Sequence, residues 1–450
     1  MFPVVNLGSP TAKPIARTRI ARTRIARTRI AMTGLTERIR EIDNRNNDPI
    51  IGTIGDVTLD RSALAAGLAA LAAERLARIR TRMAEDGLDV VVVASPENVL
   101  YATGYESMGA TINRRYSYAA IVTAGDLLMV APAADFAPAI DAGLAPDAIY
   151  PFGTFFFSGD TPAALTSVRH ATFEEAFAAA LARMGGRRIA AENAFLPKGI
   201  LDALATRTEH LCDASGWMLA LRSRKLNFEV ELLRYTTVIT ERAIEAGIAA
   251  AAVGVTDKEV ASVVASQMAL GGGLPRNLTV VGGLRSALAD AMSTDRPLER
   301  GDLLRFDVGC SFNGYKSDMA RTAVIGEPTP LQARRYAALL AGLEAEIAFI
   351  RPGVRAREVF ATAVRTVEEN GLAPFRRQHV GHAIGLAVYE HPVITPDSDE
   401  ALQAGSTFCL ETPYYEPGWG GMMVEDTGLL TESGFDLFST IDRSLRIVPI

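Results

Sequence analysis

The feature that most constrains this chain is the dipeptide Asn313-Gly314, which separates two strand-like runs, LLRFDVGCSF and YKSDMARTAVIG. Asn-Gly is a strong signal for a two-residue β-hairpin turn, because both central residues of that turn adopt positive φ. Counting outward from this turn places Gly309 opposite Asp318. Asp307 then shares one sheet face with Asp318, since side chains alternate along a strand. The sequence therefore predicts that Asp307 and Asp318 are diagonal neighbours, with their Cβ atoms about 7 Å apart.

Two aspartates at this spacing allow two interpretations. If they are buried, their charges repel each other and each loses hydration, which raises the pKa or requires a cation between them. Gly309 is then expected to leave room for that cation. If the pair instead faces solvent, the two carboxylates need no partner. The hairpin alone does not decide between a metal site and an exposed acidic pair.

A second group of candidate ligands lies in the last 75 residues. His382 stands in HVGHAIGL between two glycines, Glu411 ends the apolar run FCLE, and Glu425 lies in the returning run MMVEDTGLL. Glutamate in an apolar strand is unusual, because such residues are seldom fully buried without a partner. A salt bridge to a nearby arginine or lysine is the simpler interpretation. Together with the aspartates, however, these residues supply enough oxygen and nitrogen ligands for two divalent ions.

Composition excludes several classes of protein. A chain of 450 residues with 48% hydrophobic and 22% charged residues is globular and long enough for two domains. A net charge of −6 argues against binding to nucleic acid or to an anionic membrane surface. No apolar run approaches the roughly 18 residues of a membrane span. Three scattered cysteines do not form a disulfide framework, so we expect a cytoplasmic location.

The amino terminus has an unusual repeat. Residues 16–30 read ARTRI three times, and the first 31 residues carry seven basic and no acidic side chains. The repeat is typical of a translated DNA repeat upstream of the true start, for which Met32 is a candidate. A targeting peptide or a basic interaction tail are the alternatives. Residues 1–56 are therefore predicted to be a non-globular leader.

The rest of the chain divides into two predicted domains, 57–221 and 222–450. The first is expected to be mixed α/β, with a helix over 61–85, a buried strand in LDVVVVA and a hairpin in YAAIVTAGDLLMVAP. The second is expected to be α+β, with paired helices on an antiparallel sheet. Its predicted helices are 228–252, one that follows a capping box of Thr256 and Glu259, one that begins at Thr329-Pro330, and one that ends at Asn370-Gly371.

Four motifs in this order resemble those of the pita-bread metallopeptidases, the family of Xaa-Pro aminopeptidase, prolidase, methionine aminopeptidase and the metal-free creatinase. The motifs are DVGCSFNGYKSDMART, VGHAIGL, LETPYY and VEDT, and the resemblance extends over residues 72–440. It implies a creatinase-type amino-terminal domain, a pita-bread catalytic domain with helix pairs on a curved antiparallel sheet, and a homodimer. It also implies a metallopeptidase that hydrolyses a peptide or amide bond in a small substrate.

The resemblance assigns roles to the five candidate ligands. Asp307 should chelate one divalent ion, His382 and Glu411 should bind another, and Asp318 and Glu425 should bridge the two. The ions could be Mn, Co, Zn or Fe. A water that bridges the metals would be the nucleophile, and Glu411 would shuttle its proton to the leaving amine. Two metals would acidify that water and stabilise the tetrahedral oxyanion.

The sequence departs from the family pattern around the expected substrate. Asp290 and Tyr389 stand where the family usually has two histidines that hold the substrate and the transition state, and Met423 replaces an arginine. His391 and His379 could substitute for the missing histidines, although packing or a structural hydrogen bond is the favoured interpretation for each. Asp290 could recognise a cationic group, and Tyr389 can still donate a hydrogen bond to an oxyanion.

These departures leave three functions open. The first is a dipeptidase or aminopeptidase of the Xaa-Pro type. The second is a hydrolase or lyase of another small molecule that uses the same two-metal site. The third is a catalytically silent binding protein.

Overall fold

In the computed structural model, the described residues are 53–54, 57–58, 61–113, 115–156 and 169–450, with side chains described from residue 64 onward. All of them belong to one compact unit. The short strands β1 (Thr53–Ile54) and β2 (Val57–Thr58) pair with each other. The ARTRI repeat and the prediction of a leader over 1–56 fall almost entirely outside the described residues.

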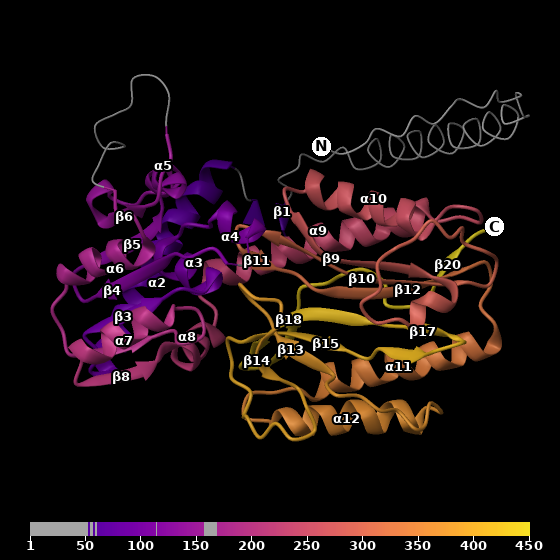
Figure 1. Cartoon of the computed structure of the whole chain (residues 1–450). Coiled ribbons are helices and arrows are strands. Elements are labelled where there is room, and N and C mark those ends of the chain that lie inside the picture. The colour runs from indigo at the N-terminus through magenta and orange to yellow at the C-terminus, as the bar shows by residue number, and fades with distance from the viewer. Residues whose placement is uncertain (1–52, 55–56, 59–60, 114, 157–168) are drawn as a thin grey trace, which may run out of the picture. The chain divides into compact units, whose positions relative to one another are not determined.

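The amino-terminal half contains a six-stranded mixed sheet in the order β6-β5-β4-β3-β7-β8 (Figure 1). Its strands are β3 (Val90–Val93), β4 (Ala119–Thr123), β5 (Leu127–Pro132), β6 (Ile149–Phe152), β7 (Arg188–Ala191) and β8 (His210–Asp213). The helices are α2 (Arg61–Asp86), α3 (Pro96–Thr103), α4 (Met108–Ile112), α5 (Phe136–Asp141), α6 (Phe173–Ala182), α7 (Lys198–Arg207) and α8 (Ala214–Ser223). Alternate valines of β3 enter two different hydrophobic clusters, which explains why the run VVVV is apolar throughout.

The carboxy-terminal half contains a ten-stranded sheet, antiparallel except where β20 joins β12. The order β11-β10-β12-β18-β15-β13-β14 is extended by β9 beside β10, β19 beside β18 and β20 beside β12. The strands are β9 (Leu274–Gly282), β10 (Leu303–Phe312), β11 (Tyr315–Lys316), β12 (Met319–Ile325), β13 (Gly381–Ala383), β14 (Glu390–Val393), β15 (Thr407–Glu411), β18 (Glu425–Thr431), β19 (Gly434–Leu437) and β20 (Arg446–Val448). A separate hairpin, β16 (Tyr414–Glu416) and β17 (Gly420–Met422), connects β15 to β18.

Two helix pairs cover this sheet: α9 (Asn227–Ala250) with α10 (Asp257–Leu270), and α11 (Pro330–Phe349) with α12 (Ala356–Glu369) (Figure 1). The first pair packs on β9 and β10, and the second packs on β13, β15 and β18. The predicted caps are confirmed, since Thr256 and Glu259 form a capping box and Thr329 caps α11. This confirms the predicted α+β architecture of helix pairs on a curved antiparallel sheet.

Alternation along the strands separates the core from the site. Phe306 and Val308 of β10 point into the core beneath α9 and α10, so Asp307 between them points to the opposite face. Leu410 of β15 likewise enters the core beneath α11, which directs Glu411 away from it. The carboxylates therefore gather on the sheet face that the helices do not cover.

The boundary predicted near residue 222 falls at the end of α8 and remains a prediction. Among the described helices, none combines the length and apolar character needed to cross a membrane.

Candidate metal centre

The hairpin that carries the two aspartates forms with the predicted register. Asn313 and Gly314 have φ of 47° and 83°, as a two-residue turn of this type needs. Strand pairing opposes Phe312 to Tyr315, and Val308 to Met319 farther from the turn. This register brings the side chains of Asp307 and Asp318 to one face of the sheet.

Gly309 has a different role from the one expected. A Cβ atom at this position would lie 2.0 Å from the Ser317 carbonyl oxygen and 2.5 Å from Asn277 Oδ1. The space beside Gly309 is thus filled by protein atoms, and the expectation that it leaves room for a cation is wrong. The glycine is required because the two hairpin strands and Asn277 approach closely here.

The ladder places the predicted glutamates in the same row as Asp307. Ala320 pairs with Asp307 on one side and with Glu425 on the other, and Glu425 in turn pairs with Glu411. His382 lies on β13, opposite Cys409 of β15. One row across four neighbouring strands therefore holds three carboxylates, with Ala320 of β12 between Asp307 and Glu425, and it lies next to the strand that holds the imidazole.

Side-chain distances show a compact cluster. One oxygen from each of Asp307, Asp318 and Glu425 lies within 4.8 Å of the other two. Nε2 of His382 is 3.9 Å from Oδ2 of Asp318. Glu425 also lies within reach of His382 and Cys409, with ligand atoms within 4.8 Å. All five predicted ligands line one cavity of about 150 Å³.

The cluster has too little positive charge for its carboxylates. Burial, followed by repulsion from neighbouring carboxylates, raises the pKa of Asp318 and of Glu425 well above the usual range. The pKa of Asp307 rises to about 6, chiefly through burial, although Arg305 opposes the shift. Oε2 of Glu425 has no hydrogen-bond partner among the described residues. The residues thus fit a divalent cation, which would supply the missing partner.

Glu411 differs from these three carboxylates. Burial alone would raise its pKa, but His379, His382 and Arg377 outweigh burial and lower it. Nδ1 of His379 lies 2.9 Å from Oε1 of Glu411, so this histidine is at the site. Glu411 is therefore the carboxylate of the cluster that stays ionised most readily.

The cavity also contains all three residues that depart from the family pattern. Asp290 and Tyr389 both line it, as does Met423. The Tyr389 ring stacks on the imidazole of His382, with centroids 3.9 Å apart, and remains 56% exposed. Tyr389 is thus a largely exposed residue of the cavity wall beside His382.

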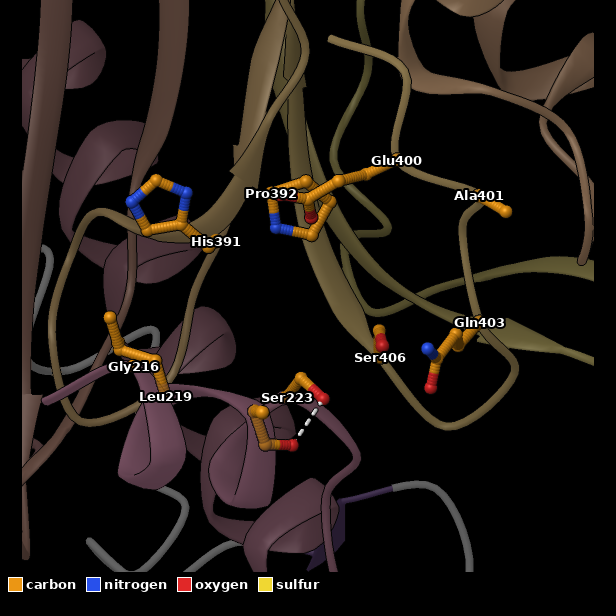
Figure 2. Close-up of a pocket in the computed structure, with 10 residues that line it drawn as sticks. Gly216, Leu219, Ser223, His391, Pro392, Glu400, Ala401, Gln403 and Ser406 are labelled. Atoms are coloured by element: carbon orange, nitrogen blue, oxygen red, sulfur yellow. Dashed lines mark hydrogen bonds between the residues drawn. The ribbon is translucent and has the colours of Figure 1, made fainter. Parts of the chain in front are cut away.

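His391 is not part of this site. It lines a separate cavity of about 370 Å³ with residues of α8 and of the segment 400–406 (Figure 2). The expectation that His391 reaches the metal ligands is not supported, because His391 lines this other cavity together with Leu219 and Ser223 of α8.

Several residues at the site were not predicted from the sequence, among them Arg305, Arg377 and Tyr415. Arg305 donates to Asp307 Oδ2 at 3.0 Å, and Arg377 and Tyr415 line or flank the cavity. The signal for Arg305 was present, since it lies two residues before Asp307 on the same strand face. Arg377 lies in an irregular segment, where no periodicity indicates the direction of a side chain.

Comparison with known proteins agrees with this geometry. The model of the creatinase/prolidase N-terminal domain matches residues 75–224, and that of metallopeptidase family M24 matches residues 231–432. The Xaa-Pro dipeptidase of Pyrococcus furiosus is 32% identical over 227 residues, which is 50% of this chain and 65% of that protein. The probable dipeptidase PepE of Mycobacterium tuberculosis is 33% identical over 255 residues, 56% of this chain and 65% of that protein. This chain thus spans slightly less than two thirds of these relatives.

Solved structures show the same fold over a longer stretch. Dipeptidase PepE from Mycobacterium ulcerans superposes with a TM-score of 0.69 and 27% identity, covering 85% of this chain and 99% of that one. An Xaa-Pro dipeptidase from Bacillus anthracis superposes with a TM-score of 0.70 and 22% identity, covering 84% and 99%. With both family models matched in order and the ligand cluster assembled, the chain belongs to metallopeptidase family M24.

Proposed function

We propose that this protein is a divalent-metal-dependent hydrolase that cleaves the peptide bond of a small substrate of the Xaa-Pro type. The observation that carries the proposal is the cluster of Asp307, Asp318 and Glu425, in which Arg305 pairs with Asp307 while Oε2 of Glu425 has no hydrogen-bond partner among the described residues. The dipeptidase names of the relatives support the substrate class.

Two ions are proposed for the site. Asp307 would hold one, His382 and Glu411 the other, and Asp318 with Glu425 would bridge them. Carboxylates with a single imidazole suit Mn, Co, Zn or Fe. When bound, such ions polarise a carbonyl and make water a stronger nucleophile at neutral pH.

The protein's own groups would orient the substrate and move the proton. Glu411 is held ionised by His379, His382 and Arg377, so it can accept a proton from the attacking water and pass it to the leaving amine. Tyr389 lines the cavity, and its hydroxyl would donate a hydrogen bond to the oxyanion. Asp290, on the cavity wall, would hold a cationic group of the substrate.

A second candidate function is a hydrolase or lyase of another small molecule at the same site. It is favoured by the presence of Asp290, Tyr389 and Met423 in the cavity, since these side chains alter the substrate-binding walls and leave the ligands intact.

The experiment that tests the proposal is a panel of Xaa-Pro dipeptides and short peptides, assayed with added Mn²⁺ or Co²⁺. We expect cleavage by the wild type and loss of at least 100-fold in kcat for Glu411→Gln, because a positioned general base contributes about 10² to 10⁴. No cleavage while metal is bound would favour the second candidate. No metal binding at all would favour a silent binding protein.

A homodimer and a cytoplasmic location complete the proposal. The described cysteines Cys212, Cys310 and Cys409 are free thiols, which is compatible with a reducing compartment. Sedimentation of the purified protein would test the dimer.

A further inference from the structure

Cys409 is a buried thiol on the sheet face that carries the metal ligands. Leu410, the next residue of β15, enters the core beneath α11, so Cys409 and Glu411 on either side of it point to the opposite face. The backbone of Cys409 pairs with His382 of β13 on one side and with Thr427 of β18 on the other. Its side chain is 0% exposed. The thiol is therefore part of the site face, next to the imidazole of His382.

The contacts of this thiol leave its sulfur without a hydrogen-bond donor. Sγ of Cys409 lies 3.3 Å from Oγ1 of Thr427 and 3.7 Å from the carbonyl oxygen of Asp318. The Thr427 hydroxyl donates its own hydrogen to the same carbonyl oxygen at 2.8 Å. Because a hydroxyl has one hydrogen, the thiol is the donor toward Thr427, and no described group donates to the sulfur. The sulfur lone pairs are thus available to an ion.

Cys409 belongs to a second group of possible ligands, which overlaps the cluster of carboxylates. One ligand atom from each of His382, Cys409 and Glu425 lies within 4.8 Å of the other two. Oε2 of Glu425 is buried without a hydrogen-bond partner among the described residues. Nδ1 of His382 is 3.1 Å from the carbonyl oxygen of Ala383, an acceptor that holds the ring proton there and leaves Nε2 to bind an ion. The group therefore offers one sulfur, one nitrogen and one oxygen.

This mixture of donor atoms indicates which ions the group fits. Zinc binds cysteine sulfur, histidine nitrogen and carboxylate oxygen at about 2.0 to 2.3 Å, and three protein ligands with an open fourth position are typical of its catalytic sites. Thiolate is a soft ligand that selects thiophilic ions, whereas Mn²⁺ prefers carboxylate oxygen. Ligand atoms within 4.8 Å of one another need to approach by only about 1 Å to surround such an ion. The group thus suits Zn²⁺ or Cd²⁺ better than Mn²⁺.

Cys310, another fully buried cysteine, has the surroundings expected of a thiol that only packs. It is a member of the hydrophobic cluster beneath α9 and α10. Cys409 belongs to none of the hydrophobic clusters of the described residues. A buried free cysteine ordinarily behaves as a small apolar side chain. The polar neighbours of Cys409 therefore favour a ligand over a packing residue.

We propose that Cys409 is a further metal ligand, which together with His382 and Glu425 binds a thiophilic divalent ion such as Zn²⁺. The thiol releases its proton to solvent as the ion binds, because thiolate is the ligand. Such an ion uses two side chains that the proposed two-ion arrangement also needs, so it competes with that arrangement. Cys409 thereby determines which metals the centre selects. The inference rests on the metal centre of the proposed function, but it requires no hydrolysis.

The test uses Cd²⁺ as an optical probe, since a cadmium–thiolate bond adds a charge-transfer band in the ultraviolet. The metal-free full-length chain would be titrated with Cd²⁺. We expect the band in the wild type and its loss in Cys409→Ser, which keeps a hydroxyl beside Thr427. Cd²⁺ affinity, measured by competition with a chelator, should fall about 10-fold or more, the scale at which even outer-shell partners of a metal act. Mn²⁺ affinity should change by less than about 3-fold, because the carboxylates remain.

Cys310→Ala and Cys212→Ser are the matched controls, and each should keep the band. Absence of the band from the wild type would overturn the inference, even if Cys409→Ser failed to fold. A band of equal strength in Cys409→Ser, or one lost in Cys212→Ser, would also overturn it, because the sulfur ligand would then lie elsewhere. Peptide cleavage with Mn²⁺ in a protein that shows no band would remove this inference alone. A band that depends on Cys409 in a protein that cleaves no peptide would support the inference without the proposed function.

Discussion

Glu390 and Glu425 are both buried glutamates of the second sheet, yet their surroundings are opposite in charge. Glu390 accepts from Arg222 at 2.5 Å, from Lys225 at 2.9 Å and from the backbone N–H groups of Leu386 and Ala387. Burial would raise its pKa, but the two cations outweigh burial and lower it to about 2. For Glu425, burial and the neighbouring carboxylates raise the pKa well above the usual range.

This difference distinguishes a carboxylate that the protein neutralises with its own cations from one that it surrounds with other carboxylates. The fold provides Glu390 with two cations, and through Arg222 it also connects Glu390 to Asn98 of α3. The same fold gathers Asp307 and Asp318 beside Glu425 without a matching number of cations. The buried negative charge of Glu390 is neutralised by the protein, whereas that of the cluster around Glu425 is not, so this cluster can take a cation from solution. The shortage of cationic partners for these carboxylates is therefore what marks the candidate metal centre.

The largest expected effect on stability comes from removing Glu390 from its cluster with Arg222 and Lys225. Glu390→Ala leaves Arg222 and Lys225 buried without their shared anion, and removing one partner of a buried pair costs about 3–5 kcal/mol. The free energy of unfolding by urea should fall by this amount. A loss under about 1 kcal/mol would mean that the cluster is hydrated and does not resemble a buried ion triad.

The pH dependence of stability tests whether Glu390 is ionised in the folded protein. Because the pKa of Glu390 is lowered from 4.5 to about 2, its contribution is present above pH 4.5 and is lost as pH falls through 2. The stability difference between the wild type and Glu390→Gln should therefore shrink by about 2 kcal/mol between pH 7 and pH 3. A difference that grows on acidification would contradict the assigned ionisation. Urea titrations at each pH provide the measurement.

The smallest effect is expected at a third buried glutamate, Glu346 of α11. Neither carboxyl oxygen has a partner among the described residues, and burial, followed by Glu411, raises its pKa well above the usual range. Glu346→Met removes this unpaired group and keeps similar volume, so stability at pH 7 should rise by about 1–2 kcal/mol. Thermal unfolding would test it. Destabilisation by more than 1 kcal/mol would show that the carboxyl has a stabilising role.

Local sequence patterns predicted which carboxylates lie together in this cluster. The Asn-Gly turn determined the register, which placed Asp307 and Asp318 together, and the apolar setting of Glu411 and Glu425 marked them as unusual. These features depend on alternation along a strand, which holds over short distances in sequence. The motif resemblance then joined segments more than 100 residues apart.

The residues that the sequence placed wrongly or missed are positioned by long-range packing. His391 follows Tyr389 by two residues, and nothing local shows that β14 carries it to a cavity beside α8. The sequence suggested free space beside Gly309, but the Ser317 carbonyl and Asn277 of β9 occupy that space. Arg377 lies in an irregular segment, so its place on the cavity wall, 4.0 Å from Glu411, became visible only in the structure.

The central claim is that the unsatisfied carboxylates bind divalent metal, and elemental analysis tests it most directly. The wild type, Asp318→Ala and Glu390→Gln should each be loaded with Mn²⁺, freed of excess metal and analysed for metal per chain. We predict about two ions in the wild type, loss in Asp318→Ala and retention in Glu390→Gln, since only the first change removes a proposed bridging ligand. Absence of metal from the loaded wild type, or equal metal in Asp318→Ala, would contradict the claim.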